Sequence, residues 1–432
     1  MEIKELFNLF GKKTSQNGRI KKFKIDSRQI EKGDFFVPIK GSRYDGHQFI
    51  KDAVKKGAVG FFTQRKDPHP ASLHVKNTLE ALTTVGKHKR RKLSFAVGIT
   101  GTSGKTTTKE LLDFVLSEYF RTYSTPGNLN NEIGHPLTLA NIPEGTQAGI
   151  FELGAGKIGD ISYLVSISKP EIRILTSVGH GHTEKFGSLE NVIKGKGEIF
   201  EGGDVGILPS GIKSFYKHKN VITFGSDEGS DIRILSAAIN DKGTEGIIQI
   251  GKKSYRVELP VFNMAVFNNL GAVFGVLHYL EIDPEKAVEK LSLFQLPEGR
   301  GKVITCKNLT IIDDTYNANP LSVENAVRTL SMIKGKKIIV LGDMLELGKY
   351  SIQKHKEVGK IIQNSPIDTA IFYGDQMRYA YEVLAGKKEV YYFTEKKDIA
   401  DLISSLKEKT TIWIKGSRGM KMEQIIHQIV QD

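Results

Sequence analysis

The stretch VGITGTSGKTTTKELLDFVL, which begins at Val97, is the feature that most constrains how this chain can fold. The run before it, LSFAVGIT, is short and continuously apolar, as in a buried parallel strand, and the run after it, TTKELLDFVLSEYF, has helical apolar spacing. A glycine-rich turn between such a strand and helix binds phosphate groups, because its backbone N–H groups turn inward and the helix N-terminus adds its positive end. The stretch therefore predicts a nucleotide triphosphate site on a parallel sheet, and the alternative is a flexible glycine turn.

The residue types in this loop match that chemistry. Lys105 supplies a positive charge, and the Thr106 hydroxyl can reach a magnesium ion. The strict pattern, G-x-x-x-x-G-K followed by serine or threonine, has glycine where Ile99 stands, so one position differs. Magnesium also needs a carboxylate, and Glu152 in GIFELGAG ends the next strong strand. The predicted nucleotide-binding residues are Gly101, Thr102, Ser103, Gly104, Lys105, Thr106 and Thr107.

The domain organisation follows from length and periodicity. A chain of 432 residues exceeds what one hydrophobic core usually supports, so we expect two or three domains. Residues 1–92 combine short strand-like and helical runs, and residues 93–297 alternate strands and helices around a strand-rich insert at 232–260. Residues 298–432 restart the alternation with five strand candidates. The predicted fold class is α/β, with a small mixed domain, a central doubly wound domain and a C-terminal α/β domain.

Composition narrows the function only a little. The net charge of +13 favours anionic partners, and nucleic acid, lipid headgroups and phosphorylated small molecules fit equally well. The basic cluster GKHKRRK from Gly86 has no interleaved aromatic residues, so we expect a solvated connector. One cysteine, Cys306, excludes an internal disulfide and a cysteine-built metal site. No apolar run spans a bilayer and no signal peptide is recognisable, so we expect a cytoplasmic protein.

These residues together resemble the Mur ligase family, and TGTSGKTTT is similar to that family's own phosphate loop, which also lacks the first glycine. The resemblance covers nearly the whole chain, and is greatest to the branch that joins D-alanyl-D-alanine to UDP-N-acetylmuramoyl-tripeptide. It implies a UDP-sugar-binding N-terminal domain, a central ATP-binding domain and a Rossmann-like C-terminal ligase domain. It also implies ATP and magnesium as cofactors, no nucleic acid, no stable membrane insertion, and a monomer that acts in peptidoglycan precursor synthesis.

The resemblance also assigns roles to residues of the N-terminal and central segments. The segment DSRQIEKGDFFVPIKGSRYDGHQFI would bind the UDP-sugar end of the substrate; by composition alone it is an exposed polar loop. The segment TPGNLNNEIGHPLTL would meet the substrate through amide side chains, although asparagine beside glycine is also typical of turns. The implied residues are Ser27, Arg28, Asp45, His47, Asn128 and Asn131.

The segment SVGHGHTEKFGSLENVIKGKGEIF would hold a magnesium-binding histidine, His182, and a carbamylated lysine, Lys196. Carbamylation gives a lysine a carboxylate-like end that can orient a metal ion or a phosphate. Lys194 lies two residues away, so the position of the modified lysine stays open, and a lysine in a polar helix is most often simply solvated. The implied catalytic residues are Lys105, His182 and Lys196.

The segment GRGKVITCKNLTIIDDTYNANPLSVENA carries most of the likeness to that branch. Arg300 would approach the nucleotide phosphates and Asp314 the ribose, and a buried strand that ends in two aspartates is costly unless they are ligands or paired. The segment WIKGSRGMKMEQI would hold the peptide carboxylate or the acceptor. The implied substrate-binding residues of this part are Tyr316, Asn317, Asn319, Lys415, Ser417 and Arg418.

Two segments depart from the family pattern. FNMAVFNN has Phe262, Met264 and Ala265 where residues that help seat adenine are expected, and it retains Asn268. The usual G-A-N after the magnesium-binding glutamate is here Gly154, Ala155 and Gly156. These departures concern adenine recognition and one substrate contact.

The implied reaction is an ATP-dependent amide ligation through an acyl phosphate, with Lys105 stabilising charge on the migrating phosphoryl group. Alternatives within the class are a Mur-type ligase that adds a single amino acid and a folylpolyglutamate synthase-like enzyme. The segments DDTYNANP and LGDMLELG argue against both. A further alternative is a P-loop switch or nucleic-acid ATPase, which would leave the C-terminal domain without a role.

Overall fold

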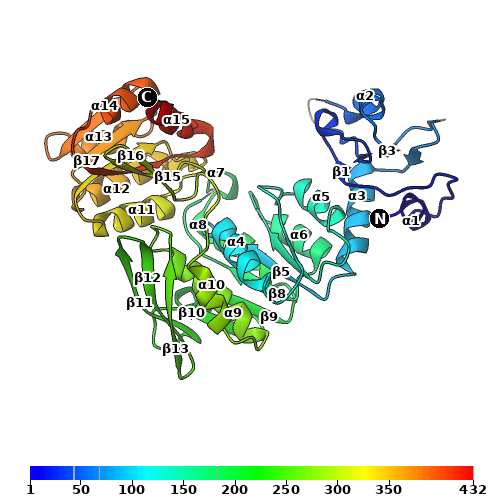
Figure 1. The fold of residues 1–432 in the computed structure, drawn as a ribbon, viewed down its shortest axis with the longest axis horizontal. Helices are drawn as coiled ribbons and strands as arrows, with labels where there is room; N and C mark the ends of the chain where they lie inside the picture. The colour runs from blue at the N-terminus through cyan, green and yellow to red at the C-terminus, as the bar shows by residue number, and fades with distance from the viewer. Residues whose placement is uncertain (42–43, 68, 182, 432) are drawn as a thin grey trace. The chain divides into compact units, whose positions relative to one another are not determined.

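The computed structural model describes every residue except 42, 43, 68, 182 and 432. The chain divides into two compact units. The first comprises residues 1–98, 119–154 and 160–172, and the second comprises residues 99–118, 155–159 and 173–432. Figure 1 labels many of the helices and strands of both units.

The N-terminal residues form a small parallel sheet whose strands follow one another in sequence order. Its strands are β1 (Phe23–Lys24), β2 (Phe35–Phe36), β3 (Gly60–Thr63) and β4 (Ser72–His74). The helical segments around it are α1 (Ile3–Leu9), η1 (Ser27–Gln29), η2 (Gly46–Phe49), α2 (Ile50–Lys55) and α3 (Thr78–Arg90). The core is aromatic, because the ring of Phe35 lies 5.4 Å from that of Phe23 and 4.9 Å from that of Phe62.

The basic cluster from Gly86 is not a connector, and that expectation was wrong. Its first five residues are the last turns of α3, and Arg90 is only 7% exposed. The Arg90 guanidinium donates to the carbonyl of Ser168 at 2.7 Å and pairs with Glu171 at 2.5 Å. Burial lowers the pKa of neighbouring Lys89 to about 8. Arg90 therefore packs the helix against the unit, whereas Lys87, Arg91 and Lys92 are exposed.

A second sheet has nine strands in the order β13-β12-β11-β10-β9-β8-β5-β7-β6. The strands are β5 (Phe95–Thr100), β6 (Thr122–Ser124), β7 (Ala148–Glu152), β8 (Ile172–Leu175), β9 (Val205–Pro209), β10 (Val221–Gly225), β11 (Ile232–Asn240), β12 (Gly243–Ile250) and β13 (Lys253–Leu259). Strand β5 stands between β8 and β7, so the chain leaves it in both directions of the sheet. This is a topological switch point, where open α/β sheets bind ligands beyond the carboxyl ends of their strands. The expected strand-rich insert is the antiparallel meander β11 to β13 at one edge.

The connections from β5 through β10 contain helical segments, and two further helices follow β13, which agrees with the predicted doubly wound architecture. They are α4 (Lys105–Leu116), α5 (Gly134–Ala140), α6 (Asp160–Ser168), α7 (Thr183–Phe186), α8 (Leu189–Gly197), η3 (Glu198–Phe200), η4 (Ser210–Phe215), α9 (Val266–Tyr279) and α10 (Glu285–Leu291). Helix α9 is buried along most of its length, because it is apolar on nearly every face.

The C-terminal residues form a six-stranded sheet in the order β14-β15-β19-β16-β17-β18. The strands are β14 (Lys302–Cys306), β15 (Leu309–Asp314), β16 (Lys336–Gly342), β17 (Thr369–Tyr373), β18 (Glu389–Phe393) and β19 (Thr410–Lys415). The helical segments are α11 (Pro320–Met332), η5 (Gly348–Tyr350), α12 (Ser351–Gln363), α13 (Arg378–Leu384), α14 (Lys396–Ser404), η6 (Arg418–Met420) and α15 (Glu423–Gln431). The five predicted strands are present, and β14 is an additional antiparallel strand on β15. Strand β19 lies between β15 and β16, so their carboxyl ends meet at one edge of the sheet.

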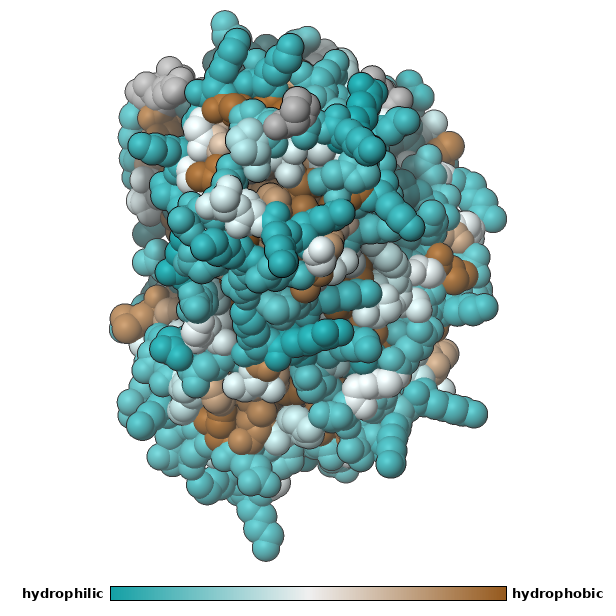
Figure 2. Space-filling model, turned by 90° about the vertical axis from the view of Figure 1, so that its right-hand side faces the viewer, coloured by the Kyte–Doolittle hydropathy of each residue, from teal (hydrophilic) through white to brown (hydrophobic). Residues whose placement is uncertain are grey.

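The described helices include none long and apolar enough to cross a membrane. Figure 2 shows a face on which hydrophilic side chains predominate and hydrophobic ones form small scattered groups. This surface agrees with a chain in which charged residues make up 26% of the sequence.

Candidate functional site

The predicted phosphate loop joins β5 to α4, and two of its glycines are required by close contacts. Gly101 has a φ of +154°, and a Cβ there would lie 2.0 Å from the Oγ1 atom of Thr176. Gly104 has a φ of +84°, and a Cβ there would lie 2.5 Å from the Oδ1 atom of Asn269. Ile99, which stands where the strict pattern has glycine, is fully buried inside β5. The loop therefore begins after that position, and the mismatch leaves its turn intact.

Hydrogen bonds fix the loop to the segment that follows β8. The Oγ1 atom of Thr176 donates to the carbonyl of Ser103 at 2.6 Å, and the amide of Ser103 donates to the Oγ atom of Ser177 at 2.9 Å. The amide of Gly179 donates to the Oγ1 atom of Thr102 at 3.1 Å. These bonds hold the loop in one conformation before any anion binds, which reduces the entropy lost on binding.

Lys105 and Thr106 begin α4, directly after the loop. The Lys105 Nζ atom donates to the carbonyl of Gly101 at 2.8 Å, so the side chain folds back over the loop. Thr106 is 7% exposed. Thr107 follows them in the first turn of the helix. The second unit thus brings together the predicted residues from Gly101 to Thr107.

The structure distinguishes the two candidate lysines of α8. Lys194 is exposed, whereas Lys196 is 1% exposed. Burial, with a smaller contribution from the charge of Lys105, lowers the pKa of Lys196 to about 7. The neutral, nucleophilic amine of Lys196 is therefore favoured at a lower pH than that of an ordinary lysine. His182 lies outside the described residues.

Glu152 ends β7 in the first unit, and its carboxylate is held by a residue that the sequence did not single out. Asn130 donates from Nδ2 to the Oε1 atom of Glu152 at 2.8 Å. The amide of Gly154 donates to the carbonyl of Asn130 at 2.8 Å, and a Cβ at Gly154 would lie 2.8 Å from its Oδ1 atom. Gly154, noted above as part of a departure, therefore allows Asn130 to approach Glu152.

The asparagines chosen from the sequence have other surroundings in the same loop. Asn128 is exposed. Asn131 is also exposed, and its Oδ1 atom accepts the amide of Gly134 at 2.8 Å at the start of α5. The requirement that a buried carboxylate have a hydrogen-bond donor is the signal for Asn130, but the sequence does not say which of three nearby asparagines provides it.

The predicted UDP-sugar residues form two similar turns in the first unit. The Arg28 guanidinium pairs with Asp26 at 2.8 Å, and this contact holds the pKa of the Asp26 carboxyl below its usual value. The Nδ1 atom of His47 lies 2.6 Å from the Oδ1 atom of Asp45, and hydrogen bonds from His47 lower the pKa of Asp45. The Ser27 carbonyl accepts a hydrogen bond from the Nζ atom of Lys56 at 3.1 Å.

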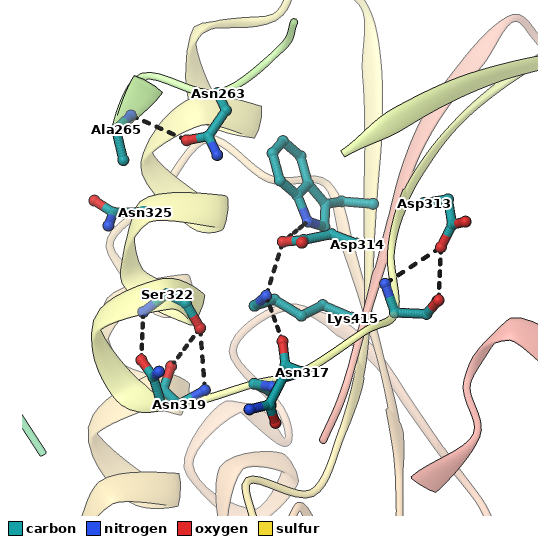
Figure 3. A network of polar contacts seen from close by, with 12 residues as sticks. Asn263, Ala265, Asp313, Asp314, Asn317, Asn319, Ser322, Asn325 and Lys415 are labelled. Carbon is teal, nitrogen blue, oxygen red and sulfur yellow. Dashed lines mark hydrogen bonds and ion pairs between the residues drawn. The ribbon is translucent and has the colours of Figure 1, made fainter. Parts of the chain in front are cut away.

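At the end of β15 the two aspartates have separate partners, as Figure 3 shows. Asp313 accepts the Oγ1 hydroxyl of Thr315 at 2.6 Å. Asp314 accepts a hydrogen bond from the Nζ atom of Lys415 at 2.8 Å and another from the indole Nε1 atom of Trp413 at 3.3 Å. Burial raises the pKa of Asp314 despite the charge of Lys415. Asp313 therefore fixes the backbone, and Asp314 lies in a cationic setting.

Neighbouring predicted residues stabilise the same edge of the sheet. Lys415 also donates to the carbonyl of Asn317 at 2.7 Å. The Oδ1 atom of Asn319 accepts the amide of Ser322 at 2.9 Å and caps α11 (Figure 3). The Oγ atom of Ser417 accepts the amide of Leu345 at 2.8 Å. The side chains of Asn319 and Ser417 are thus engaged within the protein.

The segment that departs from the expected adenine seat contacts the C-terminal sheet. Phe262 packs against the hydrophobic core on the α11 side of that sheet, and the amide of Met264 donates to the Oγ1 atom of Thr329 at 3.1 Å. Asn268 is exposed, whereas the adjacent Asn269 is 7% exposed and faces Gly104. The side chain that faces the phosphate loop is therefore that of Asn269, which the sequence did not single out.

No group of three or more histidine, cysteine, aspartate or glutamate side chains lies together among the described residues. Magnesium is commonly bound by one or two carboxylates together with substrate phosphates and waters. A single buried carboxylate, Glu152, with one oxygen fixed by Asn130, fits that kind of site.

Three family models match the chain in succession. The Mur ligase family catalytic domain matches residues 19–85, the Mur ligase middle domain residues 99–277, and the Mur ligase glutamate ligase domain residues 299–418. The UDP-N-acetylmuramoyl-tripeptide–D-alanyl-D-alanine ligase of Bacillus subtilis is 33% identical, over 94% of this chain and 92% of its own. The enzyme of the same name from Escherichia coli is 31% identical, over 94% and 93%.

Solved structures of ligases from the same family superpose on nearly the whole chain. MurF from Acinetobacter baumannii superposes with a TM-score of 0.89 at 28% identity, covering 100% of this chain and 98% of its own. MurF ligase from Thermotoga maritima in complex with ADP superposes with a TM-score of 0.85 at 27% identity, covering 95% and 97%. The predicted α/β fold class and the family resemblance are confirmed.

Proposed function

Because the chain belongs to the Mur ligase family, we propose that it is the ATP-dependent ligase that joins D-alanyl-D-alanine to UDP-N-acetylmuramoyl-tripeptide. The observation that carries this function is identity above 30% over nearly the full length of ligases with that name. The preorganised phosphate loop supports the use of ATP. The enzyme therefore acts in peptidoglycan precursor synthesis.

The chemistry follows from the poor reactivity of a carboxylate toward an amine. Transfer of the γ-phosphoryl group of ATP to the tripeptide carboxylate gives an acyl phosphate and ADP. The amine of D-alanyl-D-alanine then attacks the acyl carbon, and the tetrahedral intermediate collapses to an amide and phosphate. Lys105 and the loop amides stabilise charge on the migrating phosphoryl group, and Arg300 approaches the same phosphates.

The residues proposed to bind magnesium are Thr106, Glu152 and His182. When bound, the ion neutralises phosphate charge and orients the phosphates for transfer. The low pKa of Lys196 supports carbamylation there, since the neutral amine adds to carbon dioxide, forms an N–C bond and releases a proton. ¹³C NMR under ¹³CO₂ should show a carbamate signal that is lost in Lys196→Gln and kept in Lys194→Gln.

We assign the remaining predicted residues to substrate. The UDP-sugar end is assigned to Ser27, Arg28, Asp45 and His47, and the muramoyl peptide to Asn128 and Asn131. The ribose is assigned to Asp314, and adenine to the region of Asn268. The dipeptide and peptide carboxylate are assigned to Tyr316, Asn317, Asn319, Lys415, Ser417 and Arg418. The proposed domains are residues 1–92, 93–297 and 298–432, in a monomeric cytoplasmic enzyme.

The alternative functions differ from the proposed one in the substrate that accepts the phosphoryl group or in the amine that is joined to it. A folylpolyglutamate synthase from Mycobacterium tuberculosis superposes with a TM-score of 0.62 at 14% identity, a likeness of fold alone. A Mur-type ligase for a single amino acid would use the same phosphate loop and acyl phosphate. A nucleic-acid ATPase would use the loop without an acyl acceptor.

The decisive experiment measures ADP and phosphate release with each substrate omitted in turn, and identifies the product by mass spectrometry. We expect phosphate release only when ATP, UDP-N-acetylmuramoyl-tripeptide and D-alanyl-D-alanine are all present, and a product mass equal to the condensed pair. Lys105→Ala should abolish release. Turnover with a single amino acid or with a folate in place of these substrates, or stimulation by nucleic acid, would replace the proposal with the corresponding alternative.

A further inference from the structure

The linker that enters the C-terminal sheet is bound to the loop after β15. The amide of Gly299 donates to the Oδ2 atom of Asp313 at 3.1 Å, and the amide of Tyr316 donates to the carbonyl of Gly299 at 2.9 Å. The amide of Gly301 donates to the Asp313 carbonyl at 2.6 Å. Gly299 has a φ of +74°, and a Cβ there would lie 3.2 Å from the Cβ of Tyr316. The residue between these glycines, Arg300, is therefore presented to the Tyr316 side chain.

Arg300 is stacked on the ring of Tyr316. Its Cζ atom lies 3.8 Å from the ring centroid, the distance of direct contact between a guanidinium and an aromatic ring. A guanidinium that stacks uses its flat face, and its N–H donors stay available in its own plane. The ring thus fixes the orientation of the donors without occupying them.

The neighbouring carboxylate, Asp314, forms its ion pair with another residue, and the charge of Arg300 acts on it only from beyond ion-pair distance. Asp314 pairs with Lys415 at 2.8 Å, and within the described part of the chain no carboxylate forms an ion pair with Arg300. A second guanidinium, that of Arg418, lies 5.9 Å from the same ring centroid and also pairs with Glu423 at 3.3 Å. The two guanidinium groups place positive charge near the Tyr316 ring, and this charge favours an anion there.

We infer that Tyr316 is a positioning residue that holds Arg300, and to a smaller extent Arg418, for the phosphate groups of the nucleotide. This inference rests on the proposed function, because it takes the anion to be ATP or ADP. It gives Tyr316 a role through the arginines, distinct from the direct contact with base or dipeptide that the family resemblance implies. The aromatic ring is the part that acts, and the hydroxyl is dispensable.

The test is a double-mutant cycle between Tyr316 and Arg300, with ADP affinity measured by isothermal titration calorimetry and ATP KM and kcat measured with both substrates present. Tyr316→Phe should keep ADP affinity within about 2-fold, because the ring remains. Tyr316→Leu should weaken ADP binding and raise the ATP KM by roughly 3- to 30-fold. In the Arg300→Ala background, the same leucine substitution should have little further effect.

Additive losses in the cycle would overturn the inference, because they would mean that Tyr316 contacts the ligand directly. Unchanged ADP affinity in Tyr316→Leu would overturn it as well. Arg300→Lys gives a second route if the leucine variant does not fold, because lysine keeps the charge but lacks the planar stacking surface and should therefore weaken ADP binding, though less than Arg300→Ala; unchanged ADP affinity in Arg300→Lys would overturn the inference. A wild-type protein that neither binds ADP nor releases phosphate would instead refute the proposed function itself.

Discussion

Replacing Lys415 by methionine should destabilise the C-terminal sheet, because it removes the cation that neutralises Asp314. The two residues are register partners on the adjacent strands β15 and β19. The Lys415 Nζ atom lies 2.8 Å from the Asp314 Oδ2 atom, and Lys415 is 3% exposed. Methionine keeps the volume and length of the side chain, so the change isolates the charge and its hydrogen bonds.

The magnitude follows from two opposing terms. At 2.8 Å and an effective dielectric constant of about 20, the attraction between two unit charges is about 6 kcal/mol. Desolvation of both groups offsets much of this attraction, and removing one partner of a buried pair costs about 3–5 kcal/mol. The Asp314 side chain is 20% exposed and can take up a proton, so we expect the free energy of unfolding to fall by about 2–3 kcal/mol.

Trp413 provides the assay. It is the only tryptophan in the sequence, it is 1% exposed, and its indole donates to the same carboxylate. Its fluorescence during urea unfolding therefore reports on this sheet. The deficit of Lys415→Met should shrink as the pH is lowered, because burial raises the pKa of Asp314 and the protonated carboxyl no longer needs a cation.

The control is Lys334→Met, an exposed lysine in the loop between α11 and β16, which should change the free energy of unfolding by less than about 0.5 kcal/mol. The double variant Asp314→Asn with Lys415→Met should lose less than the sum of the two single variants. Additive losses, or a loss below about 1 kcal/mol in Lys415→Met, would refute the argument that this pair stabilises the sheet.

Three further predictions concern the other sites. Gly104→Ala should weaken ADP binding more than tenfold in calorimetry, because its φ of +84° and the 2.5 Å contact leave no room for a methyl group, whereas Gly211→Ala, with nothing within 4 Å, should bind normally. Burial lowers the pKa of His135 from 6.5 to about 3, so between pH 7 and 5 only the unfolded state takes up a proton there. The wild-type protein should therefore lose about 2 kcal/mol of local stability over this pH range relative to His135→Leu. Hydrogen exchange at residues 134–140 measures this loss, and an equal pH dependence in both proteins would contradict the prediction. Asn130→Ala should weaken Mn²⁺ binding to the ADP complex about tenfold, measured by electron paramagnetic resonance, because Glu152 loses the donor at 2.8 Å; unchanged Mn²⁺ affinity would remove Asn130 from the site.

Much of the fold could be predicted because its signals are local. The apolar runs of β5, β15 and β19 are long enough to identify buried strands, and the turn after β5 carries its own glycines. The burial of Arg90, within the basic cluster from Gly86, could not be predicted, because its charge is balanced by Glu171, which is distant in sequence. Local charge density suggested solvent there, and tertiary packing buried the side chain.

In the candidate site, the sequence identified the segments correctly but not always the individual residues that make the contacts. The sequence identified the loop that holds Asn130 but not that asparagine, and in the segment that forms α9 it named Asn268 but not Asn269, which faces Gly104. It left Lys194 and Lys196 undecided, although one is exposed and the other 1% exposed. Neighbouring residues of one type differ only in the direction of their side chains, and this direction depends on how the loop or helix is packed.

The sequence by itself determined that a glycine-rich loop with Lys105 and Thr106 joins a buried strand to a helix, because backbone conformation and residue chemistry at that turn are local properties. Only the tertiary structure decided that Lys415 neutralises Asp314, that Tyr316 supports Arg300, and that Asn130 holds Glu152. Each of these pairs joins residues on different strands or loops. Their contact depends on the register and packing of the sheets, which no short stretch of sequence specifies.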